Sequence, residues 1–430
     1  MKYTITTLGC KVNRYESEAI ATILNKNGFT ACEDNETADV YILNSCTVTA
    51  TGDQKVRQTI RREHKKHPNA IVILTGCMAQ AFPEKAEELP EVDIIMGTKN
   101  RSNIIKHIMA FNSHKQRIID ISSHNKNDKF EQMEIDDFSE RTRAYLKIQD
   151  GCNRYCSYCI IPFARGYVRS KPLVDIQAEI EKIAQKGFKE VVLTGINLSC
   201  YGQDLELELY DAVKLCCNIN GIERIRLGSL EPELLSEDVI IKLSKLTKLC
   251  PQFHLSLQSG CDETLKRMNR HYNSFEYKEI VDNLRKHFNN PAITTDIMVG
   301  FPNESDEEFE QSLNFAKEIS FAQAHIFAYS RRSGTKADLM DGQISNKTKE
   351  ERSKKMILVT NLTRANYLKT LVGEEHQILF EAEKDKNVYL GYTDTYAPVL
   401  LSSTVNIKGK ILKAKIYDSD SDFCYAKLKI

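Results

Sequence analysis

The sequence lacks a long apolar run and a net charge. No apolar stretch approaches the roughly 20 residues that a membrane-spanning helix needs, so we expect no membrane partner. The opening residues, MKYTITT, form a strand-like run without the apolar segment of a secretory signal, which predicts a cytoplasmic protein. Lysine plus arginine and aspartate plus glutamate both number 59, so no overall electric field draws the chain onto nucleic acid. A nucleic-acid partner would have to bind local basic patches.

The chain contains enough material for several folded domains of the α/β class. At 430 residues, with 41% hydrophobic and 27% charged residues, it is globular and too long for one core. Residues 1–118 alternate β-rich runs with helical patterns, which predicts a doubly wound parallel sheet. Its strand candidates are Lys2–Leu8, Val40–Leu43, Ile71–Leu74 and Asp93–Met96. Residues 122–141 are polar and lack apolar periodicity, so we interpret 119–141 as a linker.

The alternation resumes, with longer spacing, over residues 142–367. Six strand–helix units predict a (βα)6 partial barrel of the TIM-barrel kind, with its site at the carboxyl ends of the strands. The expected strands are Ala144–Gln149, Glu190–Thr194, Arg224–Leu227, Phe253–Leu257, Ile293–Val299 and Gln323–Ala328. Residues 368–430 change to short β-like runs, among them Val405–Ile411, which predicts a small β-barrel.

Thirteen cysteines is a high and odd number for a cytoplasmic chain. Cytoplasmic thiols are kept reduced and an odd number cannot pair completely, so both facts argue against a disulfide framework. We therefore expect some of these thiols to bind a metal or to take part in catalysis. The following fit no ligand spacing and are interpreted as ordinary small thiols: Cys32, Cys200, Cys216, Cys217, Cys250, Cys261 and Cys424.

The strongest pattern is a C-x3-C-x2-C run, the loop cysteines (Cys152, Cys156 and Cys159), just after the first strand of the central domain. Three thiolates so close together can hold three irons of a 4Fe–4S cubane and leave the fourth iron open. An open iron can chelate S-adenosylmethionine (SAM) and pass an electron into its sulfonium, which yields a 5′-deoxyadenosyl radical. A structural zinc site is the alternative, but it would need a fourth Cys or His at matching spacing.

A second set, the sheet-edge cysteines (Cys10, Cys46 and Cys77), follows three predicted strands of the N-terminal domain. Parallel strands point their carboxyl ends to one edge of the sheet, where ligand sites gather. We therefore expect these thiols to lie on one rim and to bind a second cluster with an open iron. Taken singly, each would be interpreted as a small buried residue.

The order of these motifs carries a resemblance to a known family. LGCKVN, NSCTVT, LTGCMAQ and LKIQDGCNRYCSYC, followed by LTGIN, LGSLEP, SLQSGCDETLKRMNRHY and TDIMVGFPNESDEEFEQS, resemble the methylthiotransferase branch of the radical SAM enzymes. Residues 368–430 resemble the TRAM RNA-binding domain, so the resemblance covers essentially the whole chain. LGCKVN resembles the form found in threonylcarbamoyladenosine tRNA methylthiotransferases, although Ser45 stands where members often have Thr. The absence of a hydrophobic tail resembles the bacterial type.

The resemblance implies a reaction and its partners. The cluster on the loop cysteines would reduce SAM, and the cluster on the sheet-edge cysteines would supply sulfur methylated by a second SAM. The product would be 2-methylthio-N6-threonylcarbamoyladenosine at position 37 in the anticodon loop of tRNA. An electron donor such as flavodoxin or ferredoxin is implied, and a DNA partner is not. Isopentenyladenosine or a protein side chain as substrate stays open, as does an iron–sulfur electron-transfer protein with an RNA-binding tail.

The resemblance also implies SAM contacts at the strand ends and beside the last loop cysteine: Tyr158, Gly195, Asn197, Ser229, Glu231, Gln258 and Asp296. Ordinary strand-end hydrogen bonds, or aromatic packing for Tyr158, are the alternatives. Arg165 and Arg169 either grip an anionic part of the substrate or form ion pairs near the cluster.

Local basic patches are the expected RNA contacts. The predicted helix 54–67 is rich in lysine and arginine, although a basic helix is often only a solvated face. The C-terminal segment carries the barrel lysines (Lys408, Lys410, Lys413 and Lys415) near three tyrosines, Tyr389, Tyr392 and Tyr396. Lysines and aromatics on a small β-barrel are typical of an RNA platform. We predict that deleting residues 368–430 weakens tRNA binding and spares SAM cleavage.

Overall fold

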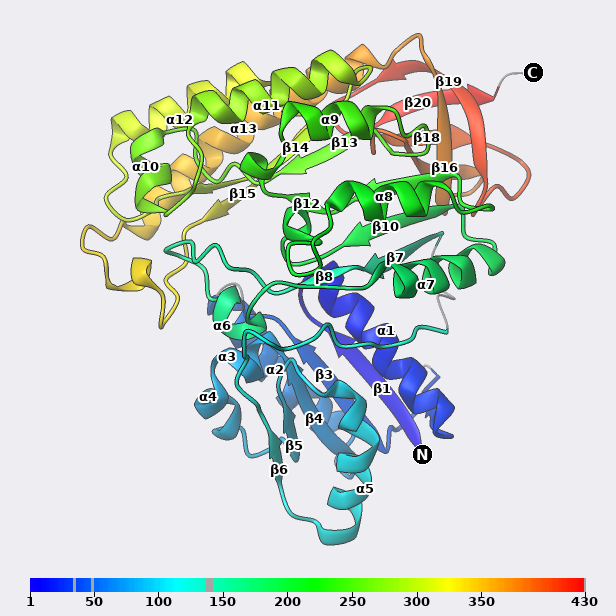
Figure 1. Cartoon of the computed structure of the whole chain (residues 1–430), viewed down its shortest axis with the longest axis vertical. Helices are drawn as coiled ribbons and strands as arrows, with labels where there is room; N and C mark the ends of the chain where they lie inside the picture. The colour runs from blue at the N-terminus through cyan, green and yellow to red at the C-terminus, as the bar shows by residue number, and fades with distance from the viewer. Residues whose placement is uncertain (34–35, 48–49, 137–141, 429–430) are drawn as a thin grey trace.

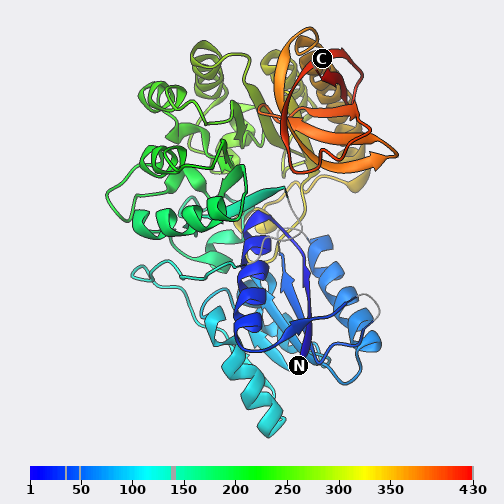
Figure 2. The ribbon, with the colours of Figure 1, turned by 90° about the vertical axis from the view of Figure 1, so that its right-hand side faces the viewer.

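The computed structural model describes residues 1–33, 36–47, 50–136 and 142–428. The N-terminal domain, blue to cyan in Figure 1, lies below the central domain, and the C-terminal barrel packs on one side of the central domain. Figure 2 shows that the barrel sits above the N-terminal sheet, with the beginning of α1 pointing toward the junction of all three bodies. The predicted doubly wound sheet, partial barrel and small β-barrel are confirmed.

The N-terminal sheet is parallel and runs in the order β2-β1-β3-β4-β5-β6. Its strands are β1 (Lys2–Thr7), β2 (Thr30–Ala31), β3 (Val40–Ser45), β4 (Ile71–Gly76), β5 (Ile94–Met96) and β6 (Ile118–Asp120). Its helices are α1 (Lys11–Lys26), α2 (Ala50–Lys66), α3 (Cys77–Ala81), α4 (Pro83–Glu87), η1 (Arg101–Asn103) and α5 (Ile104–His114). Because the chain builds β2 on one side of β1 and β3 on the other, a topological switch point lies between β1 and β3.

Strand β3 shows why this sheet is buried on both faces. Val40 and Ile42 pack into a cluster with Ile20 and Leu24 of α1. Tyr41 and Leu43 point the other way, into a cluster that includes side chains of α2 and α3. A strand covered on both faces reads as a continuous apolar run, which is why the sequence predicted it.

The central domain is a partial barrel of parallel strands with helices outside. Its strands form two runs, β7-β10-β11 and β12-β13-β14-β15, joined by a parallel bridge between Ile225 and Leu249. They are β7 (Arg143–Lys147), β10 (Glu190–Thr194), β11 (Arg224–Leu227), β12 (Ser229–Leu230), β13 (Gln252–Leu255), β14 (Ala292–Val299) and β15 (Gln323–Ala328). A short antiparallel pair, β8 (Gln149–Asp150) with β9 (Arg169–Ser170), stands beside the first strand.

The helices of the central domain are α6 (Ile161–Arg165), α7 (Leu173–Gln185), η2 (Leu198–Cys200), α8 (Leu209–Cys217), η3 (Pro232–Leu234), α9 (Glu237–Ser244), α10 (Asp262–Arg267), α11 (Ser274–His287), α12 (Asp306–Ile319), η4 (Lys336–Leu339) and α13 (Asn346–Thr370). The longer helices cover the outside of the barrel, whereas α6 lies against α3 of the N-terminal domain (Figure 1). The long helix α13 leads into the C-terminal barrel. Within the described residues, no helix is both long and apolar enough to cross a membrane.

The C-terminal body is a closed barrel in the order β16-β17-β18-β20-β19. Its strands are β16 (Glu375–Asp385), β17 (Val388–Thr393), β18 (Pro398–Ser402), β19 (Ile411–Ser419) and β20 (Cys424–Leu428). The predicted strand Val405–Ile411 is wrong, because the chain turns there and β19 begins only at Ile411. Gly409, with φ 78°, supplies the left-handed backbone of that turn.

Candidate active site

The loop cysteines lie between β8 and α6, at the mouth of the partial barrel. The loop is folded back on itself by backbone hydrogen bonds, from Cys152 N–H to the Gly166 carbonyl and from Cys159 N–H to the Cys156 carbonyl, both at 3.0 Å. Burial raises the pKa values of the Cys152 and Cys159 thiols, and the nearby charge of Cys156 raises both further. Cys152 and Cys159 are thus close enough to Cys156 to feel its charge, and with raised pKa values they need a cationic centre to hold them as thiolates.

Two polar side chains approach the sulfur atoms of this loop. Asn197 Nδ2 lies 3.8 Å from Cys152 Sγ, and its Oδ1 is buried without a hydrogen-bond partner among the described residues. Arg270 donates to Cys156 Sγ at 3.4 Å and forms an ion pair with Glu231. Arg270 was missed from the sequence, because no spacing links a basic residue after α10 to a cysteine loop more than a hundred residues earlier.

The sheet-edge cysteines meet at the carboxyl ends of β1, β3 and β4, where they were expected. Cys10 is the residue before α1, and Cys77 is the first residue of α3. A Cβ atom added to Gly9 would come within 2.9 Å of the Cβ of Cys46, so the Cys10 and Cys46 loops touch. Burial raises the pKa of Cys77 to about 12, and the charges of Cys46 and Cys10 act in the same direction.

A network of buried hydrogen bonds holds this edge of the sheet in place. Asn13 donates to the Ser45 carbonyl at 2.9 Å, and Asn44 donates back to the Asn13 carbonyl at 2.8 Å. Ser45, the departure from the family pattern, donates to the Thr75 carbonyl at 2.6 Å. Gly76 has φ 99°, and a Cβ there would lie 2.5 Å from the Ser45 carbonyl, so only glycine fits before Cys77.

A cavity of about 570 Å³ lies between the sheet-edge site and the partial barrel, and none of the loop cysteines is among its described lining residues. One wall is the segment from Gly9 to Val12, which includes Cys10. The facing walls are barrel strands, and Tyr396 of the C-terminal barrel closes one end. All three bodies therefore contribute to one concave site, as expected for the carboxyl edges of parallel strands.

The residues expected to contact SAM divide between the cavity and the cysteine loop. Gly195, Ser229 and Asp296 line the cavity, and Asp296 Oδ2 lies 3.2 Å from His254 Nε2. Asn197 and Glu231 lie beside the loop, as described above.

The other two expected contacts are held by backbone pairing and packing. Gln258 has φ 66° and is fixed by a hydrogen bond from its N–H to the Asp296 carbonyl at 2.9 Å. Tyr158 packs edge-on against Phe301, with ring centroids 6.4 Å apart, which matches its packing alternative.

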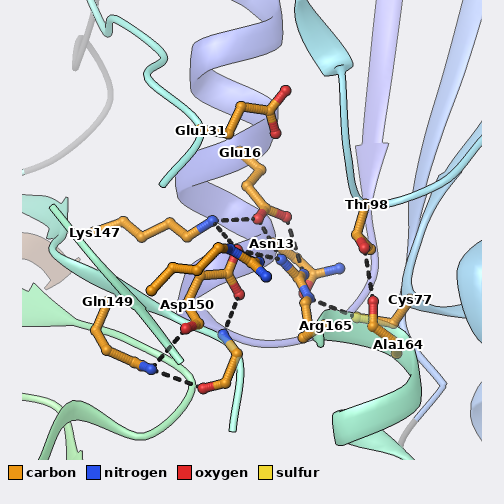
Figure 3. Close-up of polar contacts among 12 residues, drawn as sticks. Asn13, Glu16, Cys77, Thr98, Glu131, Lys147, Gln149, Asp150, Ala164 and Arg165 are labelled. Carbon is orange, nitrogen blue, oxygen red and sulfur yellow. Dashed lines mark hydrogen bonds and ion pairs between the residues drawn. The ribbon is translucent and has the colours of Figure 1, made fainter. Parts of the chain in front are cut away.

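The two arginines after the loop do not face solvent. Arg165 is fully buried and contacts Glu16, Asn13 and Cys77 (Figure 3). Arg169 is also buried, 3.5 Å from Asp150. Of the two alternatives for Arg165, the structure matches the ion pair near the cluster site, because its guanidinium is committed to the interface between the first two domains.

The expected RNA contacts are partly corrected. The barrel lysines are exposed, and so are Lys55, Arg61, Arg62, Lys65 and Lys66 of α2. Tyr389 is buried in the barrel core and cannot stack on a base. Tyr392 and Tyr396 stack on each other at 4.7 Å, and Arg143 lies over both rings, so this pair docks the barrel on the central domain.

Both cysteine sets fit iron–sulfur clusters. Among the described residues, no three His, Cys, Asp or Glu side chains converge tightly enough to share one metal ion. In a cubane each thiolate binds its own iron, so the sulfur atoms stand further apart than around a single zinc. Arg270 and Arg165 direct N–H groups at the sulfurs, and the unpartnered Asn197 oxygen offers an acceptor to a polar ligand beside the loop.

Comparisons with known proteins agree with this geometry. Residues 2–97 match the family described as "Uncharacterized protein family UPF0004", and residues 146–316 match the "Radical SAM superfamily". The threonylcarbamoyladenosine tRNA methylthiotransferase MtaB of Bacillus subtilis (strain 168) is 38% identical over 418 residues, which is 95% of this chain and 92% of that protein. The tRNA-2-methylthio-N(6)-dimethylallyladenosine synthase of Clostridium botulinum (strain Hall) is 35% identical, over 98% and 95%.

A solved structure shows the same fold. The radical S-adenosylmethionine methyltransferase TsrM from Kitasatospora setae, with cobalamin and a [4Fe-4S] cluster bound, superposes with a TM-score of 0.59 at 12% identity. The match covers 78% of this chain and 77% of that one.

Proposed function

We propose, since the chain belongs to the radical SAM tRNA methylthiotransferase family, that it adds a methylthio group to carbon 2 of N6-threonylcarbamoyladenosine at position 37 of tRNA. It is a transferase that uses two 4Fe–4S clusters, with SAM as radical source and methyl donor. When bound, these groups supply the radical that removes hydrogen from carbon 2 and the sulfur that replaces it. The loop cysteines would hold the first cluster, and the sheet-edge cysteines the second.

The cavity between the sheet-edge site and the strand ends of the partial barrel is the observation that carries this proposal. Its Cys10 wall belongs to the second cluster site, and its Gly195, Ser229 and Asp296 walls belong to the proposed SAM site. A base held in this space is within reach of both reagents, and positioning of this kind supplies much of the catalytic advantage.

The charge of the cavity favours the threonylcarbamoyl group over the isopentenyl group. Lys11, Arg143 and Arg226 line the cavity together with Asp296, and both arginines are paired with the buried Glu190. Lys11 forms no ion pair with any described residue. It is also the first residue of α1, where the helix dipole disfavours a cation unless an anion lies nearby. A threonyl carboxylate is such an anion, so we assign Lys11 to its recognition; an isopentenyl group has no charge to offer.

The test compares two tRNA substrates and two lysines of the same helix. Reconstituted enzyme is given tRNA carrying threonylcarbamoyladenosine or isopentenyladenosine, and the nucleosides are analysed by mass spectrometry. Lys11→Gln should raise KM for the first tRNA about tenfold or more, as expected for loss of a charge-assisted hydrogen bond. Lys26→Gln, at the opposite end of α1, should change nothing because Lys26 pairs with the exposed Glu134 and Asp136. Methylthiolation of the isopentenyl substrate alone would overturn the substrate assignment.

Partners follow from the same assignment. The exposed lysines of the barrel and the basic face of α2 are the proposed contacts to the tRNA backbone. The modified adenosine would be turned out of the anticodon loop into the cavity. A small electron donor such as flavodoxin or ferredoxin would reduce the first cluster, and the substrate places the reaction in the cytoplasm.

A further inference from the structure

One arginine connects the two cluster sites. Arg165 ends α6, the helix that directly follows the loop cysteines, so its backbone belongs to the first site. Its side chain crosses into the N-terminal domain, where Nε donates to Cys77 Sγ at 3.1 Å (Figure 3). The sulfur it contacts belongs to the second site.

The guanidinium of Arg165 has one available orientation. One of its terminal nitrogens donates to Glu16 Oε2 at 3.0 Å and to Asn13 Oδ1 at 3.1 Å, and the other forms an ion pair with the second oxygen of Glu16. The side chains of Arg165 and Glu16 are both fully buried. Because the guanidinium is planar and both of its terminal nitrogens are bonded, its Nε–H can point in one direction only, which is toward Cys77.

Glu16 is itself held from several sides. Arg101 lies 3.1 Å and Lys147 2.8 Å from its Oε1 atom. Lys147 also pairs with Asp150 at 2.6 Å, so the network extends from α1 to β8, the strand that directly precedes the loop cysteines (Figure 3). Of these cations, Arg165 is the one with a hydrogen bond to a cysteine sulfur among the described contacts of the network.

Hydrogen bonds and charge near a ligand sulfur alter the electronic properties of an iron–sulfur cluster. A donor to the thiolate withdraws electron density from the iron, and a fixed positive charge favours the reduced, more negative form. Both effects are strong where water is excluded.

We propose that Arg165 is a positioning residue that orients Cys77 and raises the reduction potential of the cluster held by the sheet-edge cysteines. This inference rests on the proposed function only in assigning a cluster to those cysteines. Helix α6 would then act at both sites, because it directly follows the loop cysteines and its last residue changes the reduction potential of the cluster on the sheet-edge cysteines.

The experiment isolates the second cluster. The loop cysteines are replaced by Ala in the full-length chain, which is reconstituted anaerobically and titrated potentiometrically with detection by electron paramagnetic resonance. Arg165→Gln, placed in this background, should shift the midpoint potential to a more negative value while iron stays at about four per chain. Arg165→Lys should shift it less, because the charge remains and the fork is lost.

Arg101→Gln is the matched control, since it removes a buried cation from Glu16 without touching a sulfur. An unchanged potential in Arg165→Gln, or an equal shift in Arg101→Gln, would overturn the proposal. If Arg165→Gln binds no iron while Arg165→Lys and Arg101→Gln do, the orienting role is supported. Equal iron loss in all three variants would contradict it. Failure of the parent background to bind iron would instead contradict the assignment of a cluster to the sheet-edge cysteines.

Discussion

Glu190 holds together the first strands of the central barrel, and its loss should cost more than any surface charge. Its carboxylate is fully buried at the start of β10. Arg226 lies 2.9 Å, Arg224 3.4 Å and Arg143 3.5 Å from its oxygen atoms. Each arginine comes from a strand next to β10, so Glu190→Gln would leave three buried cations facing one another without their shared anion.

Two independent arguments give the same magnitude for Glu190→Gln. Removing one partner of a buried ion pair costs about 3–5 kcal/mol. Burial by itself would raise the pKa of Glu190, but the charges of Arg226 and Arg143 outweigh it and lower the value from 4.5 to about 2. That interval corresponds to about 3 kcal/mol of folding free energy at neutral pH. We therefore expect the variant to be less stable by about 3 kcal/mol.

The lowered pKa of Glu190 also determines how the folding stability depends on pH. The folded pKa lies below the unfolded one, so the stabilisation is fully present above about pH 4.5 and disappears as the pH falls toward 2. Urea unfolding followed by far-UV circular dichroism is the assay, because the chain contains no tryptophan for fluorescence. The difference between the unmodified protein and Glu190→Gln should be largest at pH 7 and shrink between pH 4.5 and 3.

Glu223→Gln is the control. Glu223 pairs with Lys189 at 3.3 Å on the protein surface, so its loss should cost less than about 1 kcal/mol. If Glu190→Gln costs no more than Glu223→Gln, or if its effect is the same at pH 7 and pH 3, the carboxylate is not the anchor that its contacts indicate.

Three further outcomes are expected. Replacing the sheet-edge cysteines by Ala should lower iron from about eight to about four per chain, retain SAM cleavage and abolish methylthiolation, as measured by iron analysis and nucleoside mass spectrometry. Gly76→Ala should reduce iron similarly, because its Cβ would lie 2.5 Å from the Ser45 carbonyl; full iron content would contradict this. Replacing the barrel lysines by Ala should weaken tRNA binding and flatten its salt dependence without changing SAM affinity, and an unchanged salt slope would exclude them as phosphate contacts.

Local patterns predicted the sheet-edge site because each of its parts lies next to a strand. Buried parallel strands read as apolar runs, and Cys46 and Cys77 follow two such runs directly; Cys10 comes three residues after β1, a half-buried strand of alternating Thr and apolar residues. The sequence did not predict β2 and β6, which are short and not fully buried, whereas the equally short β5 is apolar and buried and was predicted. The strand order, which sets the switch point beside Cys10 and Cys46, emerged only from the structure.

Long-range charge pairs were beyond the reach of sequence patterns. Arg165 and Glu16 are 149 positions apart, and each reads locally as one charge on a helix, which is normally solvated. Tyr396 likewise reads as an exposed aromatic on a barrel, whereas Arg143 and Arg226 both lie 4.8 Å from its ring centroid. Such pairs form only when the domains pack against one another, and no periodic pattern in the sequence predicts how the domains pack.

Because the C-terminal barrel is bonded to the central domain, deleting it should affect more than tRNA binding. Arg226 donates to the Asp394 carbonyl at 2.9 Å and to the Thr393 carbonyl at 3.3 Å, and Arg224 donates to carbonyls of the same barrel. Deleting residues 368–430 removes these acceptors, and each hydrogen bond lost by a buried cation costs about 1.5–3 kcal/mol. It also opens the cavity at its Tyr396 end.

We therefore expect the deletion to lower the unfolding temperature and SAM cleavage as well as tRNA affinity, in contrast to the separable binding module that the sequence indicated. Formation of 5′-deoxyadenosine and the thermal unfolding midpoint are the two measurements, with the variant lacking the barrel lysines as the control that keeps every buried contact. A truncated protein that cleaves SAM at the full rate, with an unchanged midpoint, would show that the barrel only binds tRNA. Loss of both properties, absent from the lysine variant, would show that the barrel completes the central domain.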